Sequence, residues 1–547
     1  MKARQTTARQ LLDSGAKKID DALKDAPEAK LSVLETLFRL YVDLGLQEQG
    51  AALGRSRVAL AKSLYGPAHP EVARALIELA AESGESSFAK NRPALLKEAG
   101  SILDRNGDFK SRTRALYYLA MGNAFLDTDV ASSAAYAVRS VNLYRQYPPS
   151  RELVSALNLL GQRQEMQDQF PEAIATLTEA ARIANQLQGE ARRPLPAIYA
   201  VLGTAQRMVL DFSAAEKSQR LSLEVAHALK GDESVDVLQT EWRLGAFLSQ
   251  TSRPVEGLEF LKKAVDQALR TQGPDESFHT PMVQRAYGVH LLKYGRVEEG
   301  LAALTQASVR ARRSRDRDLD FIYTLACNVV AETEAGHYRQ AESMVEEADA
   351  ISARLGGKSS TGEVNDLRLA RATLLQAEGK GDEAAKCLQK SAVPPEAPGK
   401  ISYNWLDVSL AHATVELTQG HPAAALEQAA EVQRRLEGSG KALYFKRWAS
   451  EAALIEGKSL LLENRAAGAL PQLQRAVQLG SEVYDPELSP DLADAKIALA
   501  LCLLDLGRSE QAHAVGSQAK AIHKANRELG EHYRRPLRQL EARIRLH

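Results

Sequence analysis

The residue patterns that carry phosphate chemistry occur in this sequence only as incomplete fragments. The run GGKS at 356–359 resembles the end of a phosphate-binding loop, but such a loop needs a glycine where Ser352 stands and a strand before it. The preceding residues follow a helical pattern, so we interpret the run as a loop at the end of a helix. The Gly-rich loop, strand lysine and His-Arg-Asp loop of a protein kinase are also absent from the sequence.

Residue types that bind metals are scattered along the chain. The 11 histidines form no His-Glu-x-x-His motif, and Cys327, Cys387 and Cys502 form no Cys-x-x-Cys pair. Each cysteine lies in an apolar helical stretch, where a small buried thiol is typical. We therefore expect no metal site, no cofactor and no catalytic residue, and we predict that the chain is not an enzyme. The alternative, an enzyme with an unrecognised site, would be detected as ATP hydrolysis or phosphotransfer by the purified protein.

Charge gives no sign that nucleic acid or a membrane is the partner. Lys plus Arg equals 70 and Asp plus Glu equals 70, so the chain has no net charge to attract a polyanion. The basic run 310–315 is followed by Asp316 and Asp318, which favours a solvated helix end over a nucleic-acid site. Arginines between 534 and 545 fit the wet side of a last helix. No apolar stretch is long enough to span a bilayer, and no apolar signal segment opens the chain, so we expect a cytoplasmic protein.

A repeat of about 42 residues organises the chain. A glycine preceded by a large apolar residue recurs at 122, 161, 203, 245 and 288, and a turn lies seven residues beyond each one. Apolar residues on either side of these turns are three and four positions apart, which indicates helices. Counting in both directions predicts turns at Gly45, Gly84, Asp129, Asp168, Leu210, Ser252, Gly295, Gly336, Gly379, Gly420, Asn464 and Gly507.

Five residues after each predicted turn stands a glycine or an alanine. Two antiparallel helices joined by a short turn lie too close together at this point for a larger side chain. The positions are Gly50, Ala89, Ala134, Ala173, Ala215, Gly257, Gly300, Ala341, Ala384, Ala425, Ala469 and Ala512. This register predicts helix–turn–helix units that bury their apolar faces only against their neighbours.

The predicted fold is therefore all-α, an α-solenoid of about twelve helix–turn–helix repeats with a capping helix at each end. We predict an N-terminal cap over 1–27, repeats 1–9 over 28–391, a Pro-rich joint at 392–400, repeats 10–12 over 401–530 and a C-terminal cap over 531–547. Proline-rich segments interrupt helices, which is why the joint is placed there. A stack of this kind presents a long concave surface.

The small-residue register and the Leu-Gly step resemble the tetratricopeptide repeat (TPR), a right-handed superhelix of paired helices. The period and the run HPEVA at 69–73 look like the longer repeat of kinesin light chains, and the resemblance covers about residues 28–526. In such repeats the first helix of each unit lines the concave face. The resemblance therefore implies a partner-binding groove made by Asn123, Asn158, Gln162, Glu165, Thr204, Arg207, Gln239, Trp242, Ser249 and Arg285. For each of them, a solvated side chain without a partner is the alternative.

The same positions in the last two repeats are nearly all apolar. An apolar face must be covered, and we expect the C-terminal helix to cover it, with an apolar peptide as the alternative. The residues concerned are Leu454, Lys458, Leu461, Ile497, Leu501 and Leu504.

A second, narrower resemblance concerns the first 70 residues. The runs TARQLLDSGAKKID at 7–20 and YGPAHP at 65–70 are similar to the region that follows the kinase domain in many bacterial serine/threonine protein kinases. This implies an alternative function, the ligand-sensing and extracytoplasmic part of a kinase-type signalling protein. The kinase domain or membrane tether would then be on a separate chain, and the location would be periplasmic. Our main hypothesis is a non-catalytic scaffold that binds a protein or peptide partner along repeats 3–7.

Overall fold

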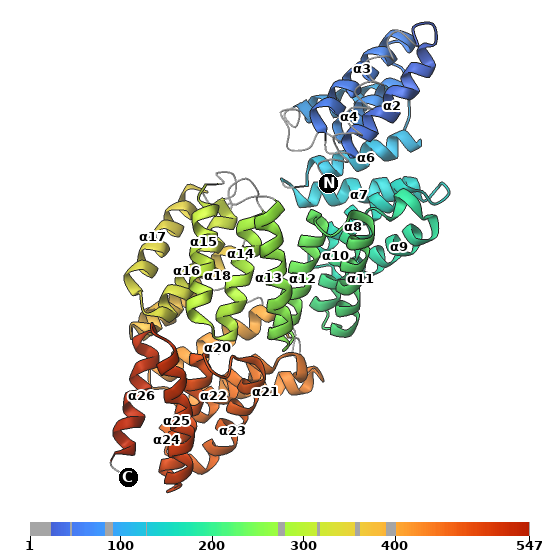
Figure 1. The fold of residues 1–547 in the computed structure, drawn as a ribbon. Helices are drawn as coiled ribbons and strands as arrows, with labels where there is room; N and C mark the ends of the chain where they lie inside the picture. Colours follow the sequence, from blue (N-terminus) through green and yellow to red (C-terminus); the bar gives the residue numbers. More distant parts are fainter. Residues whose placement is uncertain are drawn as a thin grey trace. The chain divides into compact units, whose positions relative to one another are not determined.

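The computed structural model (Figure 1) describes residues 23–43, 46–81, 91–126, 128–271, 279–313, 318–355, 361–389 and 401–545. Every regular element in these ranges is helical, and the 25 α-helices, α2 to α26, pack in consecutive pairs. The predicted all-α solenoid is thus confirmed. The predicted N-terminal cap up to residue 22, the GGKS run and the joint at 392–400 lie outside the described residues. None of the described helices is both long and apolar enough to cross a membrane.

The chain forms two compact units, Met1–Val225 and Ala226–His547. The boundary falls inside helix α11, Phe212–Lys230, in the fifth repeat. The helices before and after the predicted joint, α19 and α20, pack against each other inside the second unit. The joint itself stays a prediction.

The first unit holds repeats 1–4 and most of repeat 5. Its core includes Phe38, Leu76 and Ile102 in the early repeats and Leu157, Leu177 and Ile198 in the later ones. Its helices are α2 (Pro27–Asp43), α3 (Gln47–Tyr65), α4 (Pro70–Ala81), α5 (Arg92–Arg105), α6 (Arg112–Ala124), α7 (Val130–Tyr144), α8 (Arg151–Met166), α9 (Phe170–Leu187), the 3-10 helix η2 (Gly189–Arg192), α10 (Leu195–Met208) and the start of α11.

The second unit holds repeats 6–12 and the C-terminal helix. Its helices are α12 (Val235–Gln250), α13 (Pro254–Thr271), α14 (His279–Tyr294), α15 (Val297–Ala311), α16 (Asp318–Ala335), α17 (Tyr338–Arg354), α18 (Thr361–Ala377), α19 (Gly381–Gln389), α20 (Tyr403–Thr418), α21 (Pro422–Gly438), the 3-10 helix η3 (Ala442–Tyr444), α22 (Lys446–Leu462), α23 (Ala466–Val483), α24 (Pro490–Asp505), α25 (Ser509–Ala525) and α26 (Glu531–Ile544).

Serine caps begin the first helix of several repeats. The hydroxyl of Ser150 accepts from the N–H of Leu153 at 3.3 Å, and Ser234 and Ser402 cap α12 and α20 in the same way. Such a cap satisfies an N–H that has no partner inside the helix, and it is typically worth about 1 kcal/mol. The caps therefore fix where the concave helices start.

Nine predicted turn residues have a positive φ angle, which reverses the chain between the two helices of a repeat. The next N–H then returns to a carbonyl five residues back, as Arg253 does to Leu248 at 2.9 Å. The nine are Asp168, Leu210, Ser252, Gly295, Gly336, Gly379, Gly420, Asn464 and Gly507. The turn register read from the sequence is confirmed at these positions.

The small-residue register also marks where paired helices approach most closely. A Cβ added to Gly257 would lie 2.6 Å from the carbonyl oxygen of Gly245, and one added to Gly245 would lie 2.7 Å from that of Gly257. No side chain fits at either position without moving the helices apart. The third repeat differs, because there Ser133 is fully buried and Ala134 is not. The prediction of Ala134 as the contact residue was therefore one position too far, since a serine also fits when its hydroxyl bonds the carbonyl of Gly122 at 2.8 Å.

Within the second unit, turns contact the starts of helices five repeats later. Ser252 Oγ accepts from the N–H of Lys446 at 3.4 Å, and the carbonyl of Tyr294 accepts from the N–H of Asp485 at 2.7 Å. The carbonyl of Glu334 accepts from the N–H of Gly530 at 2.8 Å. We call this set of contacts the seam. It closes the stack of repeats 6–12 on itself.

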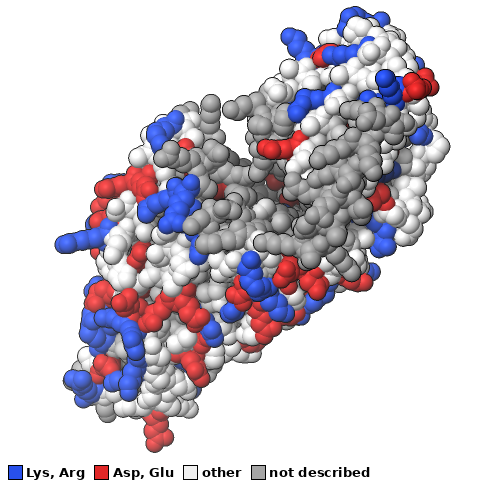
Figure 2. Space-filling model, turned by 45° about the horizontal axis from the view of Figure 1, so that its top comes forward, with Lys and Arg blue, Asp and Glu red and all other residues white. Residues whose placement is uncertain are grey.

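The C-terminal helix α26 packs on α24 and α25. Leu537, Leu540 and Ile544 join the apolar cluster that contains Ile497 and Leu504. The last helix thus packs on the last repeat, and the cap over 531–547 stays a prediction. Its arginines form ion pairs, Arg538 with Glu531 and Arg543 with Asp505. On the face drawn in Figure 2, basic and acidic side chains are intermixed around the lower end of the molecule.

Candidate functional site

The first helices of six consecutive repeats surround a cavity of about 530 Å³ in the second unit. Its wall comes from α14, α16, α18, α20, α22 and α24, and Tyr484 and Tyr533 complete it. First helices were expected to line the concave face, and in this unit they do. Because the seam joins the two ends of the stack, the concave face here becomes the wall of a cavity.

A single register selects eleven of the 28 residues of the wall. In α18, three wall residues are Leu369, Thr373 and Gln376, which stand three before, one after and four after the position equivalent to the repeat glycine. This is the register that predicted the groove in repeats 3–7. The same spacing places Val289, Leu292, Ala326, Val330, Thr414, Leu417, Leu454 and Lys458 in the wall.

The wall combines apolar side chains with an excess of carboxylates. Leu292, Val330, Leu369 and Leu454 give it apolar surface. Its charged residues are Glu334, Asp366, Asp407, Glu451, Asp491 and Asp494 against Lys293, Arg447 and Lys458.

Two of the three cations are held in ion pairs. Arg447 lies 3.0 Å from Asp407 and 3.7 Å from Glu451. Lys458 contacts Asp494. The indole N–H of Trp448 also donates to Asp407 at 2.6 Å. These pairs fix α20, α22 and α24 relative to one another and neutralise two of the carboxylates.

Tyr533 connects two carboxylates from different helices. Its hydroxyl lies 2.8 Å from Asp491 Oδ1 and also hydrogen-bonds Glu334. A phenol has one proton and can donate to one carboxylate, so the other must keep its own proton to donate to the phenol oxygen. Burial, and then the charge of Asp491, raise the pKa of Glu334 to about 8, and burial also raises the pKa of Asp491. Ionising Glu334 and Asp491 at the same time is therefore unfavourable.

A third carboxyl, Glu451 on α22, has a similar environment. Burial raises its pKa to about 7, and Asp407 and Asp491 add to this effect, while Arg447 opposes it. At neutral pH, Glu334 is thus mostly protonated and Glu451 about half protonated, whereas ordinary glutamates would be ionised.

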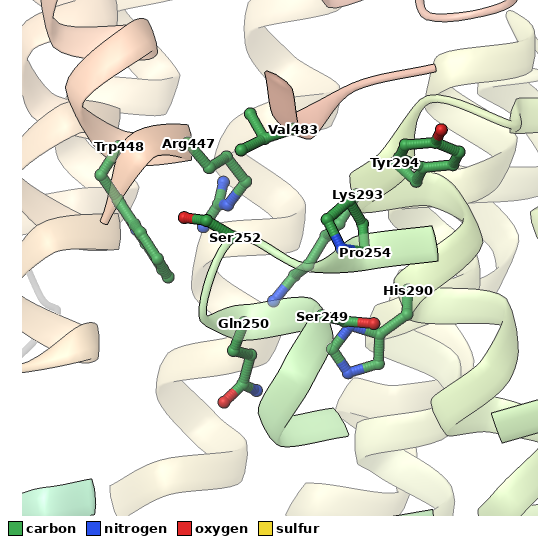
Figure 3. A pocket seen from close by; sticks show the side chains of 10 residues that line it. All are labelled: Ser249, Gln250, Ser252, Pro254, His290, Lys293, Tyr294, Arg447, Trp448 and Val483. Carbon is green, nitrogen blue, oxygen red and sulfur yellow. The ribbon is translucent and has the colours of Figure 1, made fainter. Parts of the chain in front are cut away.

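Lys293 occupies a different part of the wall. Its amine makes no hydrogen bond or ion pair with another described residue, and burial, together with the charge of Arg447, lowers its pKa. Lys293 and Arg447 also line a second, much smaller pocket of about 20 Å³ at the seam. Figure 3 shows side chains from the α12–α13 turn, from α14 and from the start of α22 around this pocket. Among them is His290, whose pKa burial lowers to about 3.

No protein-family model and no curated protein matches the sequence. Among solved structures, the apo form of RapI is similar with a TM-score of 0.50 and 10% identity, covering 66% of this chain and 96% of RapI. A Rap protein complexed with competence and sporulation factor has a TM-score of 0.46 and 12% identity, covering 68% and 100% of the two chains. BtubC from P. vanneervenii has a TM-score of 0.37 and 21% identity, covering 43% and 95%. The chain has a TPR-like helical-repeat fold. At these identities the likeness is one of fold alone.

The predicted groove residues of the first unit lie on the first helices of their repeats. Asn123 is exposed on α6, and Asn158 accepts from Gln162 at 3.2 Å on α8. The hydroxyl of Thr204 donates to the carbonyl of Ala200 on α10. Glu165 and Arg207, the other two predicted groove residues of this unit, have half-buried side chains. Their role in binding a partner stays a prediction.

The predicted groove residues of the second unit are engaged in packing between repeats. Gln239 lies 2.8 Å from the ring of His279, and Trp242 packs in the cluster of Leu238 and Val283. Arg285 donates to the carbonyl of Asp320 and to the hydroxyl of Thr324, and it lies over the ring of Tyr323 at 4.6 Å. Ser249 lines the small pocket. None of these four lines the large cavity.

Sequence reasoning missed the cavity residues although the signal for many of them was present. The predicted groove covers repeats 3–7, and the same register in repeats 11 and 12 predicts an apolar surface under the last helix, so repeats 8–10 carry no prediction. The structure corrects this for Leu454 and Lys458, which line the cavity. Tyr533 and Asp491 follow no repeat register, and only the seam brings them to the site.

Metal or thiol chemistry finds no support in the described part of the chain. No group of three or more His, Cys, Asp or Glu side chains there is arranged to hold a metal ion. Cys327 faces the cavity, but burial raises the pKa of its thiol to about 11, so the thiol stays protonated and weakly nucleophilic.

Proposed function

We propose that this chain is a non-catalytic TPR-type module that binds a segment of a protein or peptide partner in the cavity of repeats 7–12. The observation that carries the proposal is that one register of first-helix residues, repeated through five helices, supplies eleven of the residues that line a cavity of about 530 Å³. The predicted groove residues of repeats 3–5, among them Asn158 and Arg207, belong to the first unit and are proposed as a binding surface of that unit.

The chemistry of the wall supports a bound segment rather than a reaction. Its apolar side chains can take up side chains of a partner, and polar groups such as Thr373 and Gln376 can bond a peptide backbone. The buried carboxyls and Tyr533 hold one another in place, and Cys327 is protonated. An arrangement of binding groups without an activated nucleophile fits recognition.

Site-specific photo-crosslinking tests the proposal. The photoreactive residue p-benzoyl-phenylalanine is placed at Thr373, in the cavity wall, or at Leu443, which is 73% exposed on η3. We expect a crosslinked partner peptide from Thr373 only, identified by mass spectrometry after capture from the native cell. Crosslinks from Leu443 alone would contradict a cavity site.

A cavity-filling substitution provides the matching loss of function. Ala411→Trp places an indole in the wall, whereas Ala423→Trp places it on the exposed side of α21. Ala411→Trp should abolish the crosslink and Ala423→Trp should keep it. The alternative function, sensing a small molecule, is supported instead if Ala411→Trp abolishes a thermal shift given by a metabolite and no peptide is captured.

A further inference from the structure

We propose that the cavity seats a positively charged side chain, the ammonium of a lysine or the guanidinium of an arginine, at three carboxyls that we call the carboxylate triad: Glu334, Glu451 and Asp491. This inference rests on the proposed function and names the chemistry of the segment that would bind. The evidence is the charge left in the wall after its own ion pairs are formed.

The wall is acidic even when every internal ion pair is counted. It contains six carboxyls and three cations, a formal excess of three negative charges. Arg447 is held by Asp407 and Glu451, and Lys458 by Asp494. Lys293 pairs with none of them. The three excess charges develop only when Glu334 and Glu451 lose their protons, and a cation that enters this site of reduced dielectric would favour that loss.

The three carboxyls of the triad lie near one another, and Glu451 shares Arg447 with Asp407. Asp491 interacts electrostatically with both Glu334 and Glu451. Neither Glu334 nor Asp491 forms an ion pair with a described residue; both hydrogen-bond Tyr533, whose hydroxyl donates to one carboxylate and accepts from the protonated form of the other. A cation placed among them could form charge-assisted hydrogen bonds with carboxyls from α16, α22 and α24 at once.

The apolar part of the wall suits the rest of such a side chain. Lysine and arginine combine an aliphatic stem with a charged end group. Leu454 and Ile455 lie on the same helix as Glu451, and Val330 lies one helical turn before Glu334. The stem could therefore pack on these residues while its charged group reaches the triad.

The raised pKa values of Glu334 and Glu451 agree with a site for a cation. The pKa of Glu334 is about 8 and that of Glu451 about 7, because burial and neighbouring carboxyls disfavour their charged forms. The groups that face Glu334 are Asp491 and Tyr533, and those that face Glu451 are Arg447, Asp407 and Asp491. An arriving cation would stabilise the carboxylates, so binding would release protons.

Three peptide pools test the inference on the full chain. Each pool contains N-acetylated, C-amidated, fluorescein-labelled hexapeptides with Ala, Leu, Ser or Val at five positions. The remaining position is Arg, Gln or Glu. We expect the Arg pool to bind at least tenfold more tightly than the Gln pool in fluorescence polarisation, and the Glu pool to bind most weakly. Binding of the Arg pool should also release protons, measured as a binding enthalpy that depends on the ionisation enthalpy of the buffer.

The outcomes separate this inference from the proposed function. Equal binding of the Arg and Gln pools, abolished by Ala411→Trp, would keep the peptide site and overturn the cation seat. Tightest binding of the Glu pool would overturn it in favour of an anion at Lys293. Binding of no pool would overturn the proposed function and this inference together.

Variants assign the preference to the triad. The double substitution Glu334→Gln and Asp491→Asn should reduce the preference for Arg over Gln to less than threefold. The control Glu427→Gln, an exposed carboxylate on α21, should leave it unchanged. A triad variant that keeps its helical circular dichroism and the full preference would contradict the assignment.

Discussion

Gly530 donates its backbone N–H to the carbonyl of Glu334 at 2.8 Å, and this bond joins the start of the last helix to the eighth repeat. The side-chain carboxyl of Glu334 also hydrogen-bonds the hydroxyl of Tyr533, three residues beyond Gly530. One short segment thus closes the stack and completes the wall of the cavity. Stability of the seam and occupancy of the cavity should therefore be coupled.

The seam can be tested at a glycine that has no room for a side chain. A Cβ on Gly295 would lie 2.3 Å from that of Ser489, whereas Gly379 has the same kind of positive φ and no atom within 4 Å of its Cβ. Gly379→Ala should cost about 1 kcal/mol, the usual strain of a left-handed residue. Gly295→Ala should lower the free energy of unfolding of the second unit by about 2 kcal/mol more, because the seam must open. Urea unfolding measures both, and equal effects would contradict the seam.

The buried carboxyl of Glu334 predicts a pH dependence of stability. Its pKa is about 8 in the folded chain against an ordinary value of 4.5, so the folded state binds a proton more readily than the unfolded state between these values. The wild type should therefore lose stability as the pH rises from about 5 to 8. Glu334→Gln removes the ionisation and should gain about 1–3 kcal/mol relative to wild type over that range.

Thermal unfolding of wild type and variant at several pH values measures this difference. The control Glu427→Gln should show no such trend. The pKa of buried His290 is about 3 in the folded chain, so its protonation in the unfolded state lowers the stability of the protein below pH 6.5. This loss is the same in wild type and variant, so the difference between them isolates Glu334. A difference that stays constant with pH would contradict the raised pKa.

The close approach of paired helices can be tested in repeat 6. Gly257→Ala introduces a Cβ 2.6 Å from a backbone oxygen, which the helices can relieve only by separating. We expect a loss of about 1–3 kcal/mol, the usual range for overpacking. Gly438→Ala, at the end of α21 with open space around its Cβ, should instead be neutral or stabilise by about 0.5–1 kcal/mol. Scanning calorimetry of both variants measures the change in unfolding free energy, and a Gly257→Ala variant as stable as Gly438→Ala would contradict the close approach.

The predicted groove of the first unit requires a test that does not disturb packing. Asn158→Ala with Arg207→Ala should weaken partner binding at least threefold if that groove contacts the partner, because two polar side chains able to bond a peptide are lost. Trp242→Ala is a poor probe, since Trp242 packs on Leu238 and Val283 and its loss would also destabilise α12. Titration with the captured partner peptide measures the effect. Unchanged affinity would remove these two residues from the site.

The fold was largely readable from the sequence because it follows from local requirements. Residues such as Ser252 and Gly336 take positive φ at turns, and Ala173 or Gly300 permit close helix packing five residues later. The positive φ recurs at nine predicted turns, and the third repeat moves the contact residue from Ala134 to Ser133, so one register predicts most of the helix pairs in the described residues. The same periodicity selects residues that line the cavity in α14, α16, α18, α20 and α22, whereas Trp242 and Arg285 at the same register pack between repeats.

The site itself depended on tertiary structure. The number of repeats in one superhelical turn results from small rotations between neighbouring repeats, and no single residue pattern encodes that sum. Only the folded second unit shows that repeat 7 meets repeat 12 and that Tyr533 reaches Glu334. Sequence therefore determined the repeating helix pair and its inner face, whereas contacts between residues about 190 positions apart decided that this face encloses an acidic cavity.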